Sequence, residues 1–208
     1  MVASGPVATD PYEIEGDAAR IAFWVNLYNA TVIKEFSERP RVGSLLRHRG
    51  LFRKVGCEVG SDFFSLDVIE HGVLRLNSKP PYSLRRTLRT GDRRLDAAPS
   101  KLDPRIHFAL NCAATSCPPV RTYAPDKLEE QLDAATRAYL GAETRFDASS
   151  GKLTLPYLMK LYATDFGGKQ VHAEYAARYL PEIARAFESE GSIGGRVEYG
   201  RYDWTIAK

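Results

Sequence analysis

Cys112, near the middle of the chain, is the residue whose type and position best suit covalent chemistry. It follows residues 105–110, where apolar and polar residues alternate as in a strand with two different faces. The end of a strand is rigid and the loop after it is accessible, so reactive groups are common there. A cysteine becomes a nucleophile when a base or a positive field favours its thiolate. We therefore predict a nucleophilic Cys112, with a packed and inert thiol as the alternative.

Histidine is the natural base for such a thiol, and the chain has 4 histidines. His107 is close in sequence, but in an extended strand its side chain and that of Cys112 would point to opposite faces. His71 belongs to a different element, so we predict His71 as the base and His107 as the alternate. Glu70 precedes His71, and adjacent residues on a helix do not face each other. We therefore expect Glu70 to assist as an acid or hydrogen-bond acceptor.

The same residues allow other interpretations. A disulfide between Cys112 and Cys117 would close a short loop. His71, His107, Cys112 and Cys117 could together offer two nitrogens and two sulfurs to zinc, although the cysteine spacing is at the edge of the usual range. In a binding or scaffold domain without chemistry, these polar groups would instead satisfy one another in the core. We predict neither a metal nor a cofactor.

The elements that would position these residues can be predicted from periodicity. After an irregular lead-in at residues 1–16, residues 17–208 are predicted to form a single domain. Residues 18–37 are apolar nearly all round, which indicates a buried helix that carries Asn29, with Asp17 as its cap. A second helix at residues 66–76 would carry Glu70 and His71.

The remaining pattern predicts an α+β domain in which helices pack on a small, mostly antiparallel sheet. We expect strands and helices in the following order: a strand at 53–59, a helix at 126–140, a hairpin at 145–155, helices at 156–163 and 171–189 with an interruption at Pro181, and a strand at 196–204. Residues 77–100 are rich in arginine. They are predicted to form a solvated basic loop, with an anion-binding patch as the alternative.

Composition excludes several functional classes. The chain has 208 residues, 44% hydrophobic and 26% charged, which is ordinary for a folded domain. A net charge of +3 is too weak to indicate nucleic-acid binding. We expect no transmembrane segment and no signal peptide in this chain, and neither a glycine-rich phosphate loop nor a Gly-x-Ser-x-Gly elbow is present. Three cysteines leave the compartment and the redox state open.

Three strings, taken together, resemble the signatures of the DUF547 family. The first is FWVNLYNA at residues 23–30, and the second is LDVIEHGVLR at residues 66–75. The third is DPRIHFALNC at residues 103–112, followed by Ser116, Cys117 and Pro118. Family members usually carry more helical chain before the first string, so a trimmed or divergent N-terminus is expected here.

The resemblance implies a set of site residues but no known function. Family members present Glu, His and Cys at the positions of Glu70, His71 and Cys112, which resembles a papain-like or transglutaminase-like cysteine hydrolase. In plant members the second cysteine is often serine, which favours Cys112 over Cys117. The hypothesis is a hydrolase or acyl-transferase-like domain acting on a substrate of the peptide or amide class. Its candidate binding residues are Asn29, Asn111, His107 and Ser116.

Overall fold

The computed structural model describes residues 9–40, 43–190 and 197–207, which fall into two compact units. The first unit comprises Met1–Gln131 and Asp203–Lys208, and the second comprises Leu132–Tyr202. The first eight residues of the expected lead-in and residue 196 of the expected last strand lie outside the described residues. That residues 17–208 form one domain stays a prediction.

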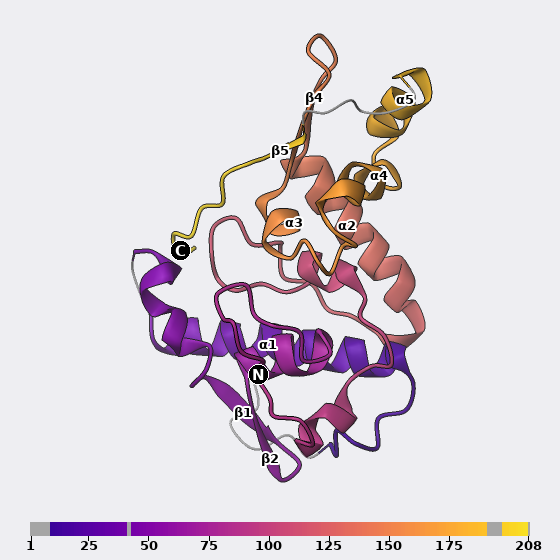
Figure 1. Cartoon of the computed structure of the whole chain (residues 1–208). Coiled ribbons are helices and arrows are strands. Elements are labelled where there is room, and N and C mark those ends of the chain that lie inside the picture. The colour runs from indigo at the N-terminus through magenta and orange to yellow at the C-terminus, as the bar shows by residue number, and fades with distance from the viewer. Residues whose placement is uncertain (1–8, 41–42, 191–196, 208) are drawn as a thin grey trace. The chain divides into compact units, whose positions relative to one another are not determined.

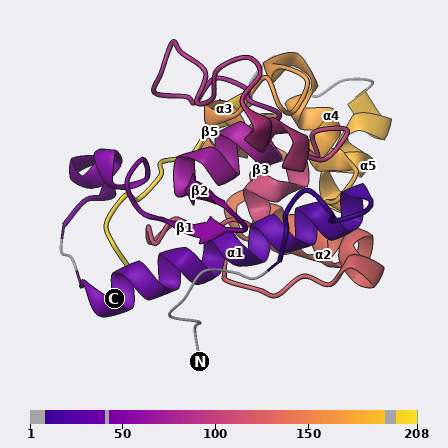
Figure 2. The same cartoon turned by 90° about the horizontal axis from the view of Figure 1, so that it is seen from below.

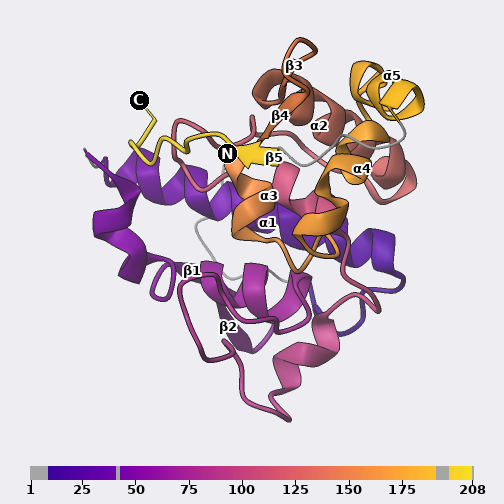
Figure 3. The ribbon, with the colours of Figure 1, turned by 45° about the horizontal axis from the view of Figure 1, so that its top comes forward.

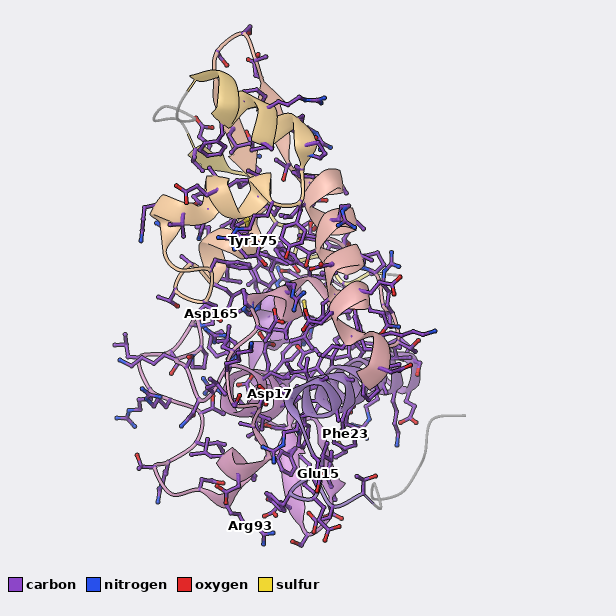
Figure 4. All side chains as sticks on the ribbon, turned by 90° about the vertical axis from the view of Figure 1, so that its right-hand side faces the viewer. Glu15, Asp17, Phe23, Arg93, Asp165 and Tyr175 are labelled. Atoms are coloured by element: carbon purple, nitrogen blue, oxygen red, sulfur yellow. The ribbon has the colours of Figure 1, made fainter. Side chains whose placement is uncertain are left out.

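Helix α1, Asp17–Glu38, runs through the first unit and confirms the predicted buried helix (Figure 1). Trp24, Val25 and Tyr28 are almost completely buried, as a helix that is apolar nearly all round requires. The predicted cap is wrong, because Gly16 takes the N-cap position and no side chain caps the helix. Asp17, labelled in Figure 4, instead accepts hydrogen bonds from the backbone nitrogen and the hydroxyl of Ser100, at 2.8 and 2.6 Å.

A β-hairpin leads into the second predicted helix. Strand β1, Gly56–Val59, pairs antiparallel with β2, Asp62–Ser65, and Gly56 lies opposite Ser65. Figure 2 shows this hairpin alongside α1. The helix that follows is confirmed, but Val68–Leu74 is a π-helix, in which Arg75 N donates to Glu70 O at 2.9 Å.

The strand predicted at residues 105–110 is wrong. Pro104–Phe108 forms a 3-10 helix whose N-cap, Asp103, accepts a hydrogen bond from Arg105 N at 2.9 Å. The physical reason is local, because an Asp cap followed by Pro in the first turn favours a helical start. His107 and its neighbours Ile106 and Phe108 are all buried, so the alternation did not mark a buried and an exposed face.

The C-terminal segment belongs to the first unit and pairs with two of its loops. Ser44 and Thr205 form one isolated antiparallel bridge, and Ala114 and Ile206 form another. Trp204 O accepts a hydrogen bond from Leu45 N at 2.7 Å. These backbone contacts hold the loop after Cys112 against the end of the chain.

The second unit contains a three-stranded sheet in the order β3-β4-β5, and Figure 3 shows its elements. Strands β3 and β4 form the predicted hairpin, whereas β5 adds to β4 in parallel. The helix pattern is confirmed, including the break at Pro181, which starts α5. The elements are α2 Leu128–Glu143, which begins in the first unit, β3 Arg145–Asp147, β4 Lys152–Leu155, α3 Tyr157–Leu161, α4 His172–Ala177, α5 Pro181–Glu190 and β5 Val197–Tyr199.

The elements confirm the α+β class, with two small and mostly antiparallel sheets. Short 3-10 helices complete the chain at Leu45–Leu51, Arg93–Ala97, Pro104–Phe108, Pro125–Lys127 and Lys169–Val171. None of the helices in the described ranges is long and apolar enough to cross a lipid bilayer.

Candidate functional site

The π-helix buries a group of charged side chains in the first unit. Glu70, His71 and Arg75 all lie on it or at its end, and each is buried. A π-helix is rare and is frequently found at functional sites, because its wider turn changes which side chains meet. Burial of both acid and base groups on one short element makes this the first part of the candidate site.

His71 is held by an arginine that the sequence analysis did not select. A guanidinium nitrogen of Arg75 lies 3.0 Å from His71 Nδ1 and 3.2 Å from Lys79 O. Because arginine only donates hydrogen bonds, Nδ1 is the acceptor, and a neutral His71 then carries its proton on Nε2. The four-residue spacing of His71 and Arg75 within one helical string was the signal that could have identified this pair.

Glu70 is in contact with Tyr28 of α1. The Tyr28 hydroxyl donates to Glu70 Oε2 at 3.1 Å. Glu70 Oε1 lies 3.7 Å from His71 Nδ1, which is too far for a hydrogen bond but close enough for an ionic contact. This agrees with the expectation that neighbours on a helix do not orient each other directly, and it leaves Glu70 as a nearby acceptor.

A second acidic group, Asp67, lies at the start of the same helix. Its carboxylate accepts a hydrogen bond of 2.6 Å from the Tyr82 hydroxyl and lies 3.5 Å from the Arg53 guanidinium. Burial raises the pKa of Asp67 to about 6, although the Tyr82 bond opposes the shift. Burial and the Asp67 charge also raise the pKa of Tyr82. The Tyr82 ring packs edge-on against His71, with ring centroids 5.7 Å apart.

Two amides position the loop that carries Cys112. Asn29 on α1 donates to Ala109 O at 3.0 Å and accepts from Asn111 N at 2.9 Å. Asn111 in turn donates to Pro118 O at 2.7 Å and accepts from Ala113 N at 2.8 Å. The structure thus uses the side chains of both predicted residues to hold the backbone on either side of Cys112.

The residue after Cys112 has a strained backbone. Ala113 has φ of 69°, in the left-handed region that costs a non-glycine residue about 1 to 2 kcal/mol. Besides the Asn111 bond to its nitrogen, Ala113 O accepts from Ala207 N at 2.9 Å. Strain of this kind persists only where the surroundings enforce it, and it is concentrated at functional sites.

Neither alternative for the cysteines is realised in the structure. Cys112 and Cys117 form no disulfide and are partly exposed, and Cys117 Sγ accepts a hydrogen bond from Cys112 N at 3.0 Å. Within the described ranges, no group of three His, Cys, Asp or Glu side chains is arranged to hold a metal ion. The zinc interpretation of His71, His107, Cys112 and Cys117 is therefore not supported.

The two remaining candidates, His107 and Ser116, differ in burial. His107 is buried on the 3-10 helix Pro104–Phe108, so the strand argument against it no longer applies. Ser116 is partly exposed, and its hydroxyl accepts from Asp203 N at 2.9 Å. Ser116 thus fastens the Cys112 loop to the C-terminal segment.

Helix α1 connects the two parts of the site. Tyr28, which contacts Glu70, and Asn29, which contacts Asn111, are consecutive residues, so one turn of α1 touches both the π-helix and the Cys112 loop. Tyr28 was in the same sequence string as Asn29 but was not selected. The three strings singled out in the sequence are therefore in contact through their polar residues.

Comparison with known proteins identifies the family. A model described as "Protein of unknown function, DUF547" matches residues 13–140, which is more than half of the chain. This chain belongs to the DUF547 family. The matched range contains every site residue discussed above except two in the C-terminal segment, Asp203 and Ala207. No curated protein and no solved structure matches this DUF547 chain, so its function must be argued from the site itself.

Proposed function

We propose that this DUF547 protein is a cysteine-dependent hydrolase or acyl transferase, acting on a substrate of the peptide or amide class. Cys112 is the nucleophile, His71 the general base and Glu70 the residue that assists it, in an arrangement akin to papain and the transglutaminases. The observation that carries the proposal is the Cys112 loop itself. A partly exposed thiol precedes the strained Ala113, and two amides and the C-terminal segment hold the backbone around it.

The proposed reaction sets a condition on His71. To take the thiol proton at Nε2, the ring must carry its other proton on Nδ1, where Arg75 now donates. Glu70 Oε1 lies 3.7 Å from Nδ1. It is the acceptor available for the Nδ1 proton once the Arg75 guanidinium has moved away from the ring. Glu70 would then play the part that a carboxylate plays beside histidine in a catalytic triad. His107 is the alternate base.

The proposed reaction has two steps. The Cys112 thiolate attacks the acyl carbon, the bond to the leaving group breaks, and the leaving group takes the proton from His71. Water, or a second nucleophile in a transferase, then attacks the thioester and releases Cys112 after giving its proton to His71. Asn29 and Asn111 act as positioning residues, because they hold the backbone that carries the thiol.

The test is the pH dependence of Cys112 alkylation. Replacing Cys57 and Cys117 by serine leaves Cys112 as the single thiol, and its rate with iodoacetamide is measured against pH. We expect thiolate to form at least one pH unit below the pKa of about 8.5 of free cysteine, and His71→Gln to abolish that difference. The matched control keeps Cys57 alone, whose pKa is raised by burial. An ordinary Cys112 titration that His71→Gln leaves unchanged would overturn the proposal.

One observation favours a second candidate, a binding or scaffold domain without chemistry. Asn29, Asn111, Ser116 and His71 all have partners within the first unit, as expected of polar groups that only stabilise a core. The alkylation experiment separates the two. In a scaffold, His71→Gln lowers the free energy of unfolding but does not move the Cys112 titration.

A further inference from the structure

We infer that a pocket beside the start of the π-helix binds the phosphate group of a small phosphomonoester. The pocket has a volume of about 350 Å³, and its lining includes Arg53, Ser65, Asp67, Arg85, Arg86 and Thr87. We call it the Arg85 pocket. It lies wholly in the first unit, and its volume is within the range typical of small-molecule sites. The inference does not rest on the proposed function.

Arginines give the Arg85 pocket its charge. The Arg85 side chain is exposed, and its guanidinium makes no hydrogen bond or ion pair with any residue that the structure describes. Arg86 uses one nitrogen to donate to Asn77 O at 2.9 Å, which leaves the rest of its donors available. Arg53 is shared, because it also faces Asp67 at 3.5 Å. Guanidinium groups recognise phosphate with paired hydrogen bonds, so this set suits an oxyanion.

Two hydroxyl groups point to a ligand independently of the charges. Thr87 Oγ1 is buried and has no hydrogen-bond partner among the described residues. Ser65 Oγ accepts from Val68 N at 3.2 Å, and its own hydrogen has no acceptor in the described part of the chain. A buried hydroxyl without a partner is unfavourable, and the Thr87 side chain can turn this hydroxyl toward a ligand oxygen because it lines the pocket.

The balance of charges selects the kind of oxyanion. Three guanidinium groups face one carboxylate, that of Asp67, so the pocket carries an excess of two positive charges when Asp67 is ionised. A phosphomonoester carries a charge of about −1.5 to −2 at neutral pH and offers three acceptor oxygens. A monocarboxylate would leave one positive charge unmatched, and inorganic phosphate alone would leave much of the volume empty.

The Arg85 pocket also adjoins the candidate catalytic group. Asp67 and Val68 line the pocket, and Glu70 and His71 follow them on the same helix. Tyr82 contacts both the pocket and the catalytic group, since its hydroxyl donates to Asp67 and its ring packs against His71. A phosphate held here would lie beside the π-helix without using any of the residues proposed for catalysis.

The test is calorimetric titration of the whole chain with glycerol phosphate, inorganic phosphate and sulfate. We expect saturable binding of glycerol phosphate, weaker binding of the two inorganic ions, and a loss of about tenfold or more in affinity in Arg85→Gln and in Thr87→Val. Thr87→Val conserves volume, and Arg85 is exposed, so both variants should fold, which circular dichroism checks. The matched control is Arg89→Gln, an exposed arginine of the same loop that does not line the pocket.

The outcomes decide the inference in either direction. Equal loss of affinity in Arg89→Gln, or non-saturable binding, would mean a general attraction to a basic loop and would overturn it. If inorganic phosphate binds as tightly as glycerol phosphate, the ligand is free phosphate, and the inference of a phosphomonoester is overturned. Because none of these variants touches Cys112 or His71, failure here is distinct from failure of the proposed hydrolase.

Discussion

His71 and His172 are both buried, one in each unit, and have different surroundings. His71 in the first unit is 2% exposed and lies among charged groups, with Arg75 at 3.0 Å and Glu70 at 3.7 Å. His172 in the second unit is fully buried among aromatic rings, those of Phe166 and Tyr199. Its Nδ1 lies 2.8 Å from the Tyr199 hydroxyl, and its Nε2 has no partner in the described ranges.

The surroundings of the two side chains distinguish the chemical role proposed for His71 from a packing role for His172. Burial lowers the pKa of His172, which favours the neutral imidazole in the folded protein. The rings around it continue through Phe166 to Tyr175, which Figure 4 labels, and the group that contacts its Nδ1 is the Tyr199 hydroxyl and not a carboxylate or a guanidinium. Burial alone therefore does not mark a catalytic histidine. The groups in contact with His71, a guanidinium at 3.0 Å and a carboxylate at 3.7 Å on its own helix, are what support the role proposed for it.

The largest expected effect comes from removing the arginine that distinguishes the two histidines. Arg75→Met removes a buried positive charge and takes away the donor that His71 Nδ1 and Lys79 O share, while Glu70 stays buried on the same helix. We expect the free energy of unfolding to fall by about 3 kcal/mol or more. Urea unfolding followed by tryptophan fluorescence measures it, because Trp24 and Trp204 both belong to the first unit.

Arg89→Met is the control for this measurement. Arg89 is exposed, so its replacement should change the free energy of unfolding by no more than about 0.5 kcal/mol. A loss of similar size in both variants would mean that Arg75 contributes only its aliphatic part and that the charged surroundings of His71 are not important.

Asp67 provides a pH test of the first unit. Its pKa of about 6 in the folded protein is above the ordinary 3.8, so folding is favoured by the protonated form. That contribution is fully present below pH 3.8 and is lost as the pH rises through 6. Asp67→Asn should therefore raise the free energy of unfolding at pH 7 by roughly 1 to 3 kcal/mol and leave it little changed near pH 4. A gain that is the same at both pH values would contradict the burial of the Asp67 charge.

His172 should give the opposite pH dependence in the second unit. Its folded pKa is below the ordinary 6.5, so its contribution to stability is fully present above pH 6.5 and is lost as the pH falls. His172→Gln cannot titrate and should remove up to about 1.4 kcal/mol per pH unit from the acid slope between pH 7 and 5. Urea unfolding followed by far-UV circular dichroism measures this slope.

His172→Phe separates titration from hydrogen bonding at this position. Both variants should flatten the acid slope, whereas only the phenylalanine loses the polar contact with Tyr199, so the two should differ in stability at pH 8. An acid slope equal to that of the unchanged protein in both variants would mean that His172 is not the group that titrates.

Much of the fold could be predicted because its signals are local. The apolar periodicity of α1, the hairpin around residue 149 and the break before Pro181 all depend on a few neighbouring residues, and each is confirmed. The strand predicted at residues 105–110 was wrong for a reason that is also local. A short alternation competes poorly with an Asp cap followed by proline, and here the cap and the proline decided the conformation.

The sequence by itself singled out the candidate residues, through the types and spacing of Cys112, His71, Glu70 and the two amides within three strings. Only the tertiary structure decided what they contact, because the partners are far apart along the chain. Tyr28 reaches Glu70 across 42 positions and Asn29 reaches Asn111 across 82. The structure also gave Arg75 its role beside His71 and brought Arg53, Arg85 and Thr87 around one pocket. Periodicity reports which face of an element is buried, whereas the partner of a buried polar group is chosen by long-range packing.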